Sequence, residues 1–170
     1  MRLLFEIDTK DYDIYGERFV RPSVRSIIIR EGKVAMVYSK KYDYYKFPGG
    51  GIESNESQIE ALVRETFEEA GLIIIPSSIR EYGYVHRIQK GEVEAIFIQD
   101  NYYYLCDVES TVLSQQLDDY EAEEEFTLVD IDPITAIITN REKPHGPKNQ
   151  NMLEREALVL EMLVKEGLLK

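Results

Sequence analysis

The chain is expected to fold as an α/β (α+β) protein in which helices pack against mixed sheets. Two observations predict this class. Strand-like runs rich in Val, Ile and Tyr occupy most of the chain, and helical spacing of apolar residues is concentrated in a central and a C-terminal segment. Helices separated by several strands pack in layers on sheets, so this order predicts a sandwich. The 170 residues show no repeat and no linker, and we expect one domain over residues 1–170.

The segment before the central helix is expected to consist of strands and one glycine loop. Residues 3–7 predict a short strand, and the polar stretch up to Pro22 predicts a hairpin or an irregular arm. Two β-rich runs, 24–30 and 34–39, flank Gly32 and predict a hairpin. The three successive glycines 49–51 then predict a loop that is bent or closely approached.

The clearest helix is expected from Ser57 to Ala70. Ser57 followed by Glu60 predicts a capping box, and Gly71 suits the residue that ends a helix. Its apolar side chains recur at helical spacing: Ile59, Leu62, Val63 and Phe67.

Later elements follow from composition and turn residues. Strands are expected at 72–75, 81–88, 93–98, 102–108 and 126–131, with turns at 90–91 and 100–101. Pro133 favours the start of a short helix that ends near Asn140. Residues 141–151 predict a polar loop, and a last helix is expected from Met152 to Glu166, stopped by Gly167.

Charge and composition narrow the function classes. Lys plus Arg number 20 against 32 for Asp plus Glu, giving a formal charge of −12, which disfavours polymeric nucleic acid and anionic membranes as partners. A polyanionic small molecule would then need local neutralisation, for which a divalent cation is suited. Cys106 is the only cysteine, which excludes an intramolecular disulfide. With no signal peptide or membrane-spanning run in sight, a cytoplasmic protein is expected.

The chemistry is expected on the central helix. Glu65, Glu68 and Glu69 are spaced i, i+3 and i+4, so the three carboxylates share one helix face. Like charges at this spacing repel by a few tenths of a kcal/mol per pair, roughly, and a bound cation would offset that. Mg²⁺ takes oxygen ligands and is often shared between carboxylates and substrate phosphates. Arg64, beside this face, could clamp one of the glutamates.

The segment from Gly50 to Leu72, GGIESNESQIEALVRETFEEAGL, resembles the signature motif of the Nudix hydrolases. Every charged position of that motif is present, and Thr66 alone departs, standing where the family has an aliphatic residue. We expect Thr66 to pack inward with a small loss of burial. The stretch 47–53 and the order of the surrounding strands also resemble the family, which implies a Nudix-type α/β/α sandwich with a mixed central sheet.

The resemblance implies roles for individual residues. Glu65, Glu68 and Glu69, with the Gly50 carbonyl, would bind Mg²⁺, with Mn²⁺ as an alternative metal. Glu56 would support the site through water on the metal, and Arg64 would hold the glutamates in place. The general base would be Glu68 or a residue of the loop 121–125.

Several of these residues also have a simpler structural interpretation. The three glutamates of the helix also suit a solvated acidic face, and Glu123, Glu124 and Glu125 are expected to be a solvated loop. Substrate binding is expected of Arg25, on phosphate, and of Tyr45 and Phe47, which could stack on a base or simply pack. His86, His145 and Cys106 are expected to be structural or surface residues.

The predicted function is that of a Mg²⁺-dependent pyrophosphohydrolase acting on a small-molecule nucleotide. A nucleoside triphosphate, unmodified, modified or oxidised, is favoured, because signatures of other substrates are missing; Arg87 occupies the position of the proline associated with ADP-ribose. The alternatives are a catalytically weak nucleotide-binding or regulatory module, or a hydrolase of a nucleotide sugar, ADP-ribose or a dinucleoside polyphosphate. A homodimer is also expected, since family members are often dimers.

Overall fold

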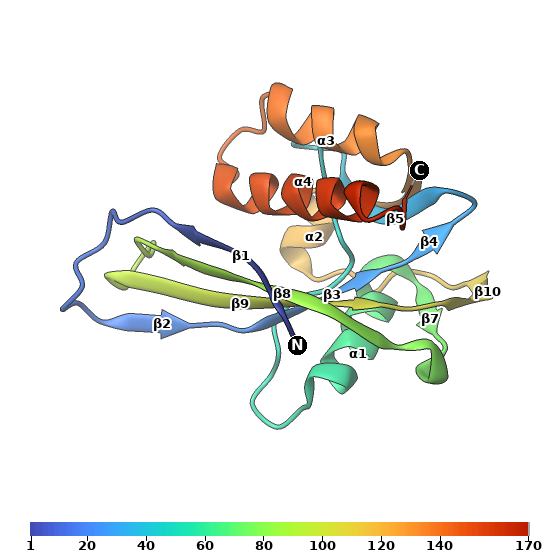
Figure 1. Cartoon of the computed structure of the whole chain (residues 1–170), viewed down its shortest axis with the longest axis horizontal. Helices are drawn as coiled ribbons and strands as arrows, with labels where there is room; N and C mark the ends of the chain where they lie inside the picture. Colours follow the sequence, from blue (N-terminus) through green and yellow to red (C-terminus); the bar gives the residue numbers. More distant parts are fainter. Residues whose placement is uncertain (170) are drawn as a thin grey trace.

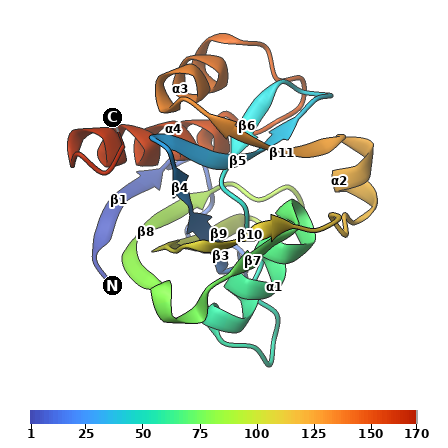
Figure 2. The same cartoon turned by 90° about the vertical axis from the view of Figure 1, so that its right-hand side faces the viewer.

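A five-stranded and a four-stranded sheet lie between two layers of helices in the computed structural model, which describes residues 1–169. Helices α3 (Pro133–Glu142) and α4 (Gln150–Lys165) cover one side, and α1 (Gln58–Ala70) lies on the opposite side (Figures 1 and 2). The short helix α2 (Asp119–Glu123) lies between these layers. The predicted α/β/α sandwich with mixed sheets is therefore confirmed.

The larger sheet combines parallel and antiparallel strands. Its path is β1-β8-β9-β2, and β3 also pairs with β9. Only the β8–β9 pair is antiparallel, since β1 runs parallel to β8, and β2 and β3 run parallel to β9. The strand bounds are β1 (Leu3–Asp8), β2 (Arg18–Val20), β3 (Ser23–Ile27), β8 (Arg80–Gln89) and β9 (Ile96–Leu105).

The other sheets are antiparallel. The four-stranded sheet has the order β11-β5-β4, with β6 also pairing β5, and β10 pairs with β7. The strands are β4 (Ile29–Arg30), β5 (Lys33–Ser39), β6 (Tyr44–Lys46), β7 (Leu72–Ile74), β10 (Val108–Val112) and β11 (Phe126–Ile131), and a 3₁₀ turn, Pro76–Ser78, follows β7.

The hairpin expected around Gly32 is divided between the two sheets. Of the first predicted run, 24–30, only the part in β4 pairs with β5, through Ile29 opposite Val34 and Arg30 opposite Lys33. Residues 23–27 pair instead with β9, and all five are buried because layers cover both faces of this strand. An apolar run gives no sign of such a change of sheet.

The turn expected at residues 100–101 is wrong, because β9 continues through it. Asp100 lies opposite His86 in the register and bonds its Nδ1 (2.7 Å). The side-chain oxygen of Asn101 accepts hydrogen bonds from Ser23 (2.6 Å) and Arg155 (2.8 Å). These partners satisfy the polar side chains inside a strand, so their tendency to form a turn is overridden.

Apolar side chains fill the space on both sides of the sheets. One cluster joins the sheets to α3 and α4 and includes Phe47, Tyr103 and Leu160. A second joins them to α1 and includes Leu62 and Cys106, whose burial, as expected for a small apolar residue, raises the pKa of its thiol to about 12. Across residues 1–169, no helix has the length and apolar character needed to cross a membrane.

Candidate active site

Local bonds fix both ends of α1, the helix that carries the acidic residues. The Ser57 hydroxyl accepts from the Glu60 amide (3.2 Å), and the Glu60 carboxylate accepts from the Ser57 amide (2.7 Å), which confirms the capping box. Gly71 ends the helix with φ 67°, a left-handed conformation that favours glycine. The face of α1 is thereby set against the sheet, with Thr66 fully buried as expected and its hydroxyl donating to Ser26 (3.0 Å).

The segment after β10 bonds the free carbonyls at the end of α1. The Leu113 amide donates to the Gly71 carbonyl (2.8 Å), and the Gln116 amide donates to the Glu68 carbonyl (2.7 Å). The Gln115 side chain donates to the Glu69 carbonyl. These contacts satisfy groups that a helix end leaves unpaired and bring the residues that follow toward the acidic face.

Arg64 joins three carboxylates of the site. Its Nη2 and Nε bond Glu56 (2.5 and 3.1 Å), and its Nη1 bonds Glu65 (2.8 Å) and Glu68 (3.1 Å). Nη2 also donates to the Gly51 carbonyl (3.2 Å). These bonds raise the pKa of Arg64, and the bond from Arg64 lowers the pKa of Glu56. The clamp expected from the sequence thus reaches Glu56 and the glycine loop as well.

The glycine loop passes against β3 and α1 at two points where a side chain would collide. Gly49 has φ 145°, and a Cβ there would lie 2.0 Å from the Val24 carbonyl oxygen. A Cβ on Gly50 would lie 2.3 Å from a carboxylate oxygen of Glu65. The Gly50 carbonyl accepts from the Val24 amide (3.0 Å), and one lone pair remains for another partner.

Glu69 lies beneath this loop and is turned inward. Lys46 of β6 donates to one carboxylate oxygen, and the Gly49 amide donates to the other (2.9 Å). Burial raises the pKa of Glu69 to about 7, against the opposing charges of Lys46 and Arg25. Burial also raises the pKa of Glu65, although the hydrogen bond from Arg64 acts in the opposite direction and lowers it. Both carboxylates are therefore in surroundings that favour a nearby cation.

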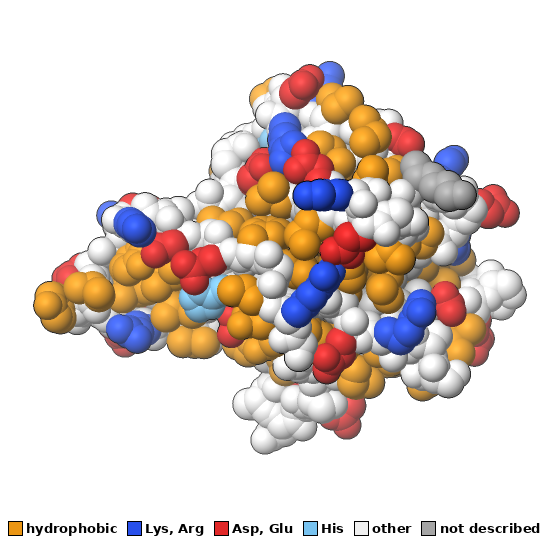
Figure 3. Space-filling view, in the orientation of Figure 1, with side chains coloured by type: hydrophobic (Ala, Val, Ile, Leu, Met, Phe, Trp, Pro, Cys, Tyr) orange, Lys and Arg blue, Asp and Glu red, His pale blue; other side chains and the backbone are white. Residues whose placement is uncertain are grey.

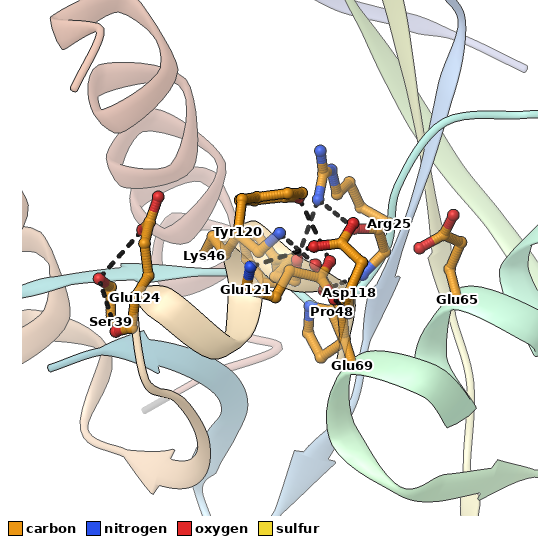
Figure 4. Close-up of polar contacts among 12 residues, drawn as sticks. Arg25, Ser39, Lys46, Pro48, Glu65, Glu69, Asp118, Tyr120, Glu121 and Glu124 are labelled. Carbon is orange, nitrogen blue, oxygen red and sulfur yellow. Dashed lines mark hydrogen bonds and ion pairs between the residues drawn. The ribbon is translucent and has the colours of Figure 1, made fainter. Parts of the chain in front are cut away.

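An acidic cavity of about 440 Å³ opens beside α1. Five acidic residues line it against two arginines, Arg21 and Arg64. The acids are Glu53, Glu65, Glu68, Asp118 and Glu121. Figure 4 shows Asp118, Tyr120 and Glu121 of the α2 segment extending toward the region of Glu69 and Arg25.

The segment 121–125 does not behave as one solvated loop. Glu121 is 6% exposed and lines the cavity, whereas Glu123 is exposed and pairs with Lys41. Glu124 is 5% exposed and bonds Tyr44 (2.7 Å), Ser39 (3.1 Å) and Lys148, away from the cavity. The solvated loop predicted for Glu123, Glu124 and Glu125 is therefore wrong for Glu124, whereas Glu123 and Glu125 are exposed as expected.

Sequence reasoning missed α2 and Asp118, although a signal was present. Asp118 accepts from the Glu121 amide (3.1 Å), and Glu121 accepts from the Asp118 amide (3.0 Å). This is a capping box of the type D-x-x-E, which could have predicted the short helix. It holds Glu121 in place at the edge of the cavity.

The predicted substrate-binding residues lie in different surroundings. Phe47 is fully buried and packs edge-on against Tyr103 (5.5 Å between ring centroids), so the prediction that it stacks on a base is wrong. Tyr45 stacks on Tyr38 (4.8 Å between ring centroids) and does not line the acidic cavity, which agrees with the packing interpretation. Arg25 is 8% exposed, and its Nη1 donates to the Gly49 carbonyl (2.6 Å).

The donors of the acidic cavity suit a hard divalent cation. They are carboxylate oxygens, and among residues 1–169 no His or Cys lines this cavity. No three such side chains in that range converge as a ready ligand cluster in this conformation. Arg64 holds Glu65 and Glu68, and Lys46 holds Glu69, so the carboxylates would have to turn partly from these cations to bind a metal.

A second cavity of about 740 Å³ adjoins the first, and Arg21 lines both. It lies between the ends of β2, β8 and β9, Tyr120, and the residues around the start of α4. Four basic residues face two acidic ones here, the reverse of the balance in the first cavity. The basic residues are Arg21, Arg87, Lys90 and Lys148.

The fold and the site together are those of the Nudix proteins: layered sheets, a helix with clustered carboxylates, and a glycine loop in contact with them. The model of the NUDIX domain matches residues 20–155, and the chain belongs to this family. Members of this family generally use divalent metal ions.

Relatives agree at the level of the fold and of a short segment. A MutT protein from Bacillus halodurans superposes with a TM-score of 0.56 at 17% identity, covering 79% of this chain and 80% of that one. A MutT NUDIX hydrolase from Burkholderia pseudomallei gives 0.56 at 18% identity, covering 84% and 98%. The RNA pyrophosphohydrolase of Pasteurella multocida is 42% identical over 64 residues, 36% of this chain and 29% of the relative. The chain thus spans under a third of that relative's length.

Proposed function

We propose that this protein is a Mg²⁺-dependent pyrophosphohydrolase that converts a nucleoside triphosphate, including modified forms, to the monophosphate and diphosphate. The observation that carries the proposal is the acidic cavity, in which Glu65 and Glu68 of α1 face Glu121 and Asp118 of the α2 segment. The neighbouring basic cavity offers room for the rest of the nucleotide. Mn²⁺ is the alternative metal.

In this reaction an oxygen of water bonds to phosphorus and the bridging P–O bond breaks. The leaving group keeps the electron pair, and attack on either side of the α–β bridge gives the same products. A bound Mg²⁺ supplies neutralisation of phosphate charge. The proposed ligands are Glu65, Glu68 and the Gly50 carbonyl, with Glu56 supporting them through its bonds to Arg64.

Glu121 is proposed as the group that takes the proton from water. It lines the cavity opposite the α1 carboxylates, and the Asp118 capping box fixes both its backbone amide and its carboxylate, which accepts from the Asp118 amide. Glu68 is the alternative base, because its side chain is 37% exposed and the bond from Arg64 occupies one of its two carboxylate oxygens and leaves the other for water. Glu69 is proposed to hold the glycine loop through Gly49 and to reach the metal only after release from Lys46.

A second candidate substrate is the 5′ end of an RNA chain. Two relatives named RNA pyrophosphohydrolase, from Pasteurella multocida and Halorhodospira halophila, are 42% and 43% identical over 64 and 53 residues. The formal charge of −12 opposes a long polyanion, although the basic cavity is a local exception. We therefore place the mononucleotide first.

The test is a hydrolysis panel with Mg²⁺ or with chelator. It would contain unmodified and oxidised nucleoside triphosphates, ADP-ribose, a nucleotide sugar, a dinucleoside polyphosphate and a short 5′-triphosphorylated RNA. Chelator-sensitive release of monophosphate and diphosphate from a nucleoside triphosphate is expected, and it should be lost in Glu68→Gln. Faster turnover of the RNA would favour the second candidate. Mg²⁺ binding without any turnover would instead favour a regulatory module.

A cytoplasmic homodimer completes the proposal. Exposed apolar side chains gather on the arm formed by the ends of β1, β2, β8 and β9, which projects to the left in Figure 3. They include Ile14, Tyr15, Val20 and Val93. A second copy of the chain would cover such a patch. Light scattering on the protein and on a Val20→Lys variant tests this, and a monomeric wild type would refute it.

A further inference from the structure

Arg87, on β8, is a buried cation whose guanidinium meets no hydrogen-bond acceptor among the described residues 1–169. Its side chain is 7% exposed, and its Nε and Nη1 are shielded from solvent without a partner. No side-chain hydrogen bond among residues 1–169 involves its guanidinium, which lies over the Phe97 ring at 5.0 Å. Burying a charge without a partner is costly, so such a group in a native protein calls for an explanation.

Acceptors near Arg87 are already used by another arginine. Gln99 lies opposite Arg87 in the register, but its oxygen accepts from Arg155 (3.2 Å). Glu156 bonds Arg155 through one oxygen (2.5 and 2.8 Å) and the Phe47 amide through the other (2.7 Å). Gln99 and Glu156 are therefore engaged elsewhere. Glu92 and Glu94 line the same cavity, but among residues 1–169 no salt bridge joins either of them to Arg87.

Positive charge exceeds negative charge around Arg87, since four basic residues line its cavity against the two acids Glu92 and Glu94. Burial, followed by the charges of Arg155 and Arg25, lowers the pKa of Arg87 to about 9. The cavity that it lines also receives Arg21 and Lys90, and Lys148, which pairs with Glu124. A neutral acceptor would satisfy the N–H groups but would leave this excess of positive charge, whereas an anion would satisfy both.

From this arrangement we infer that Arg87 binds a second anionic group of the substrate, a phosphate on its sugar, separate from the diphosphate that is cleaved. The two cavities share Arg21, so one ligand can place its diphosphate in the acidic cavity and this phosphate in the basic one. The inference rests on the proposed function for the position of the diphosphate. The anion could be a phosphate monoester or the diester that leads to a next nucleotide.

Binding in the presence of chelator tests the inference without requiring hydrolysis. Calorimetry would compare adenosine and guanosine 5′-monophosphates with their 2′- and 3′-phosphorylated derivatives and with 5′-phosphorylated dinucleotides. Wild type should bind a phosphorylated derivative at least about tenfold more tightly than the plain monophosphate, the order expected for a charge-assisted bond. Arg87→Met should lose this advantage and keep its affinity for the monophosphate. Arg80→Met, on the same strand but exposed, is the matched control and should behave as wild type.

Each other outcome overturns the inference. The inference is wrong if wild type binds the monophosphate and its phosphorylated derivative equally well, or binds neither. It is also wrong if Arg87→Met loses affinity for both to the same extent. If Arg87→Met instead removes a preference between guanosine and adenosine, Arg87 contacts the base. The dinucleotide distinguishes the two kinds of phosphate. If it binds more tightly than the monophosphate, Arg87 accepts a diester; if only the 2′- or 3′-phosphorylated derivative binds more tightly, Arg87 requires a monoester.

Thermal unfolding of the ligand-free protein gives an independent readout. Removal of an arginine that stabilises the fold lowers the melting temperature, whereas removal of an unpaired buried charge does not. Arg87→Met should therefore melt at the same temperature as wild type or higher. A marked decrease would assign Arg87 to the core and refute a binding role.

Discussion

Lys46 of β6 donates to the carboxylate of Glu69 in α1, and only 7% and 1% of the two side chains are exposed. This buried pair joins the strand that enters the glycine loop to the helix that carries the acidic site. Glu69 also accepts from Gly49, so the position of the loop depends on the charge of this one carboxylate.

Removing Lys46 should destabilise the protein strongly. Lys46→Met leaves Glu69 buried without its main cation, and breaking a buried pair in this way costs about 3–5 kcal/mol. Denaturant unfolding measures the change. Lys41→Met, which breaks the exposed pair with Glu123, is the control and should change the free energy of unfolding little. Similar effects of the two variants would show that the buried pair is not special.

The stability should depend on pH through Glu69. Its pKa is raised from 4.5 to about 7, so between these values the folded protein holds a proton that the unfolded chain has lost. The unfolded state then binds fewer protons, and the free energy of unfolding contributed by Glu69 falls as pH rises through this window. Glu69→Gln should make the dependence flatter, as followed by the denaturation midpoint. A difference between wild type and variant that stays constant with pH would contradict this.

Arg64 should not be replaceable by lysine. Its fork bonds Glu56, Glu65 and Glu68 together, and a lysine ammonium cannot reproduce that geometry. Arg64→Lys should lower kcat/KM on the order of 10–100-fold, as for other groups that orient metal ligands. Arg141→Lys is the control, because Arg141 also joins two acids, Glu154 and Glu161, on the outer surface. An unchanged kcat/KM in Arg64→Lys would rule out the orienting role.

A methyl group on Gly50 should impair the site rather than the fold. The added Cβ would meet the Glu65 carboxylate at 2.3 to 2.6 Å, so this side chain must move. We expect Gly50→Ala to lose Mg²⁺ affinity and most of the activity while it remains folded by circular dichroism. Gly32→Ala, with φ 76° and open space around it, should lower stability and leave activity unchanged. A fully active Gly50→Ala would place the metal elsewhere.

Glu121 and Glu123 should differ although they are two residues apart. Glu121 lines the acidic cavity, whereas Glu123 points to Lys41. Glu121→Gln should lower kcat by about 10²–10⁴-fold, the range for loss of a general base, with little change in Mg²⁺ affinity. Glu123→Gln should have normal kinetics. If Glu68→Gln shows the loss of kcat with intact metal binding instead, Glu68 is the base.

The amino-acid sequence by itself determined the elements that depend on neighbouring residues. The capping box at Ser57, the stop at Gly71 and the i, i+3, i+4 spacing of the glutamates are local, so the helix and its acidic face could be predicted. The Nudix resemblance rests on this same continuous segment and its spacing. The layer architecture followed from the order of helices and strands.

Tertiary structure alone decided which polar groups meet. Asn101 and Asp100 continue a strand because Ser23, Arg155 and His86, distant in sequence, bond them. Phe47 lies in the core although it enters the glycine loop, and Glu121 and Glu124, three residues apart, face different surroundings. Burial and hydrogen bonding depend on partners brought together by folding, and no local pattern specifies them. The unpaired Arg87 could be found only in this way, because an absent partner is a property of the folded chain.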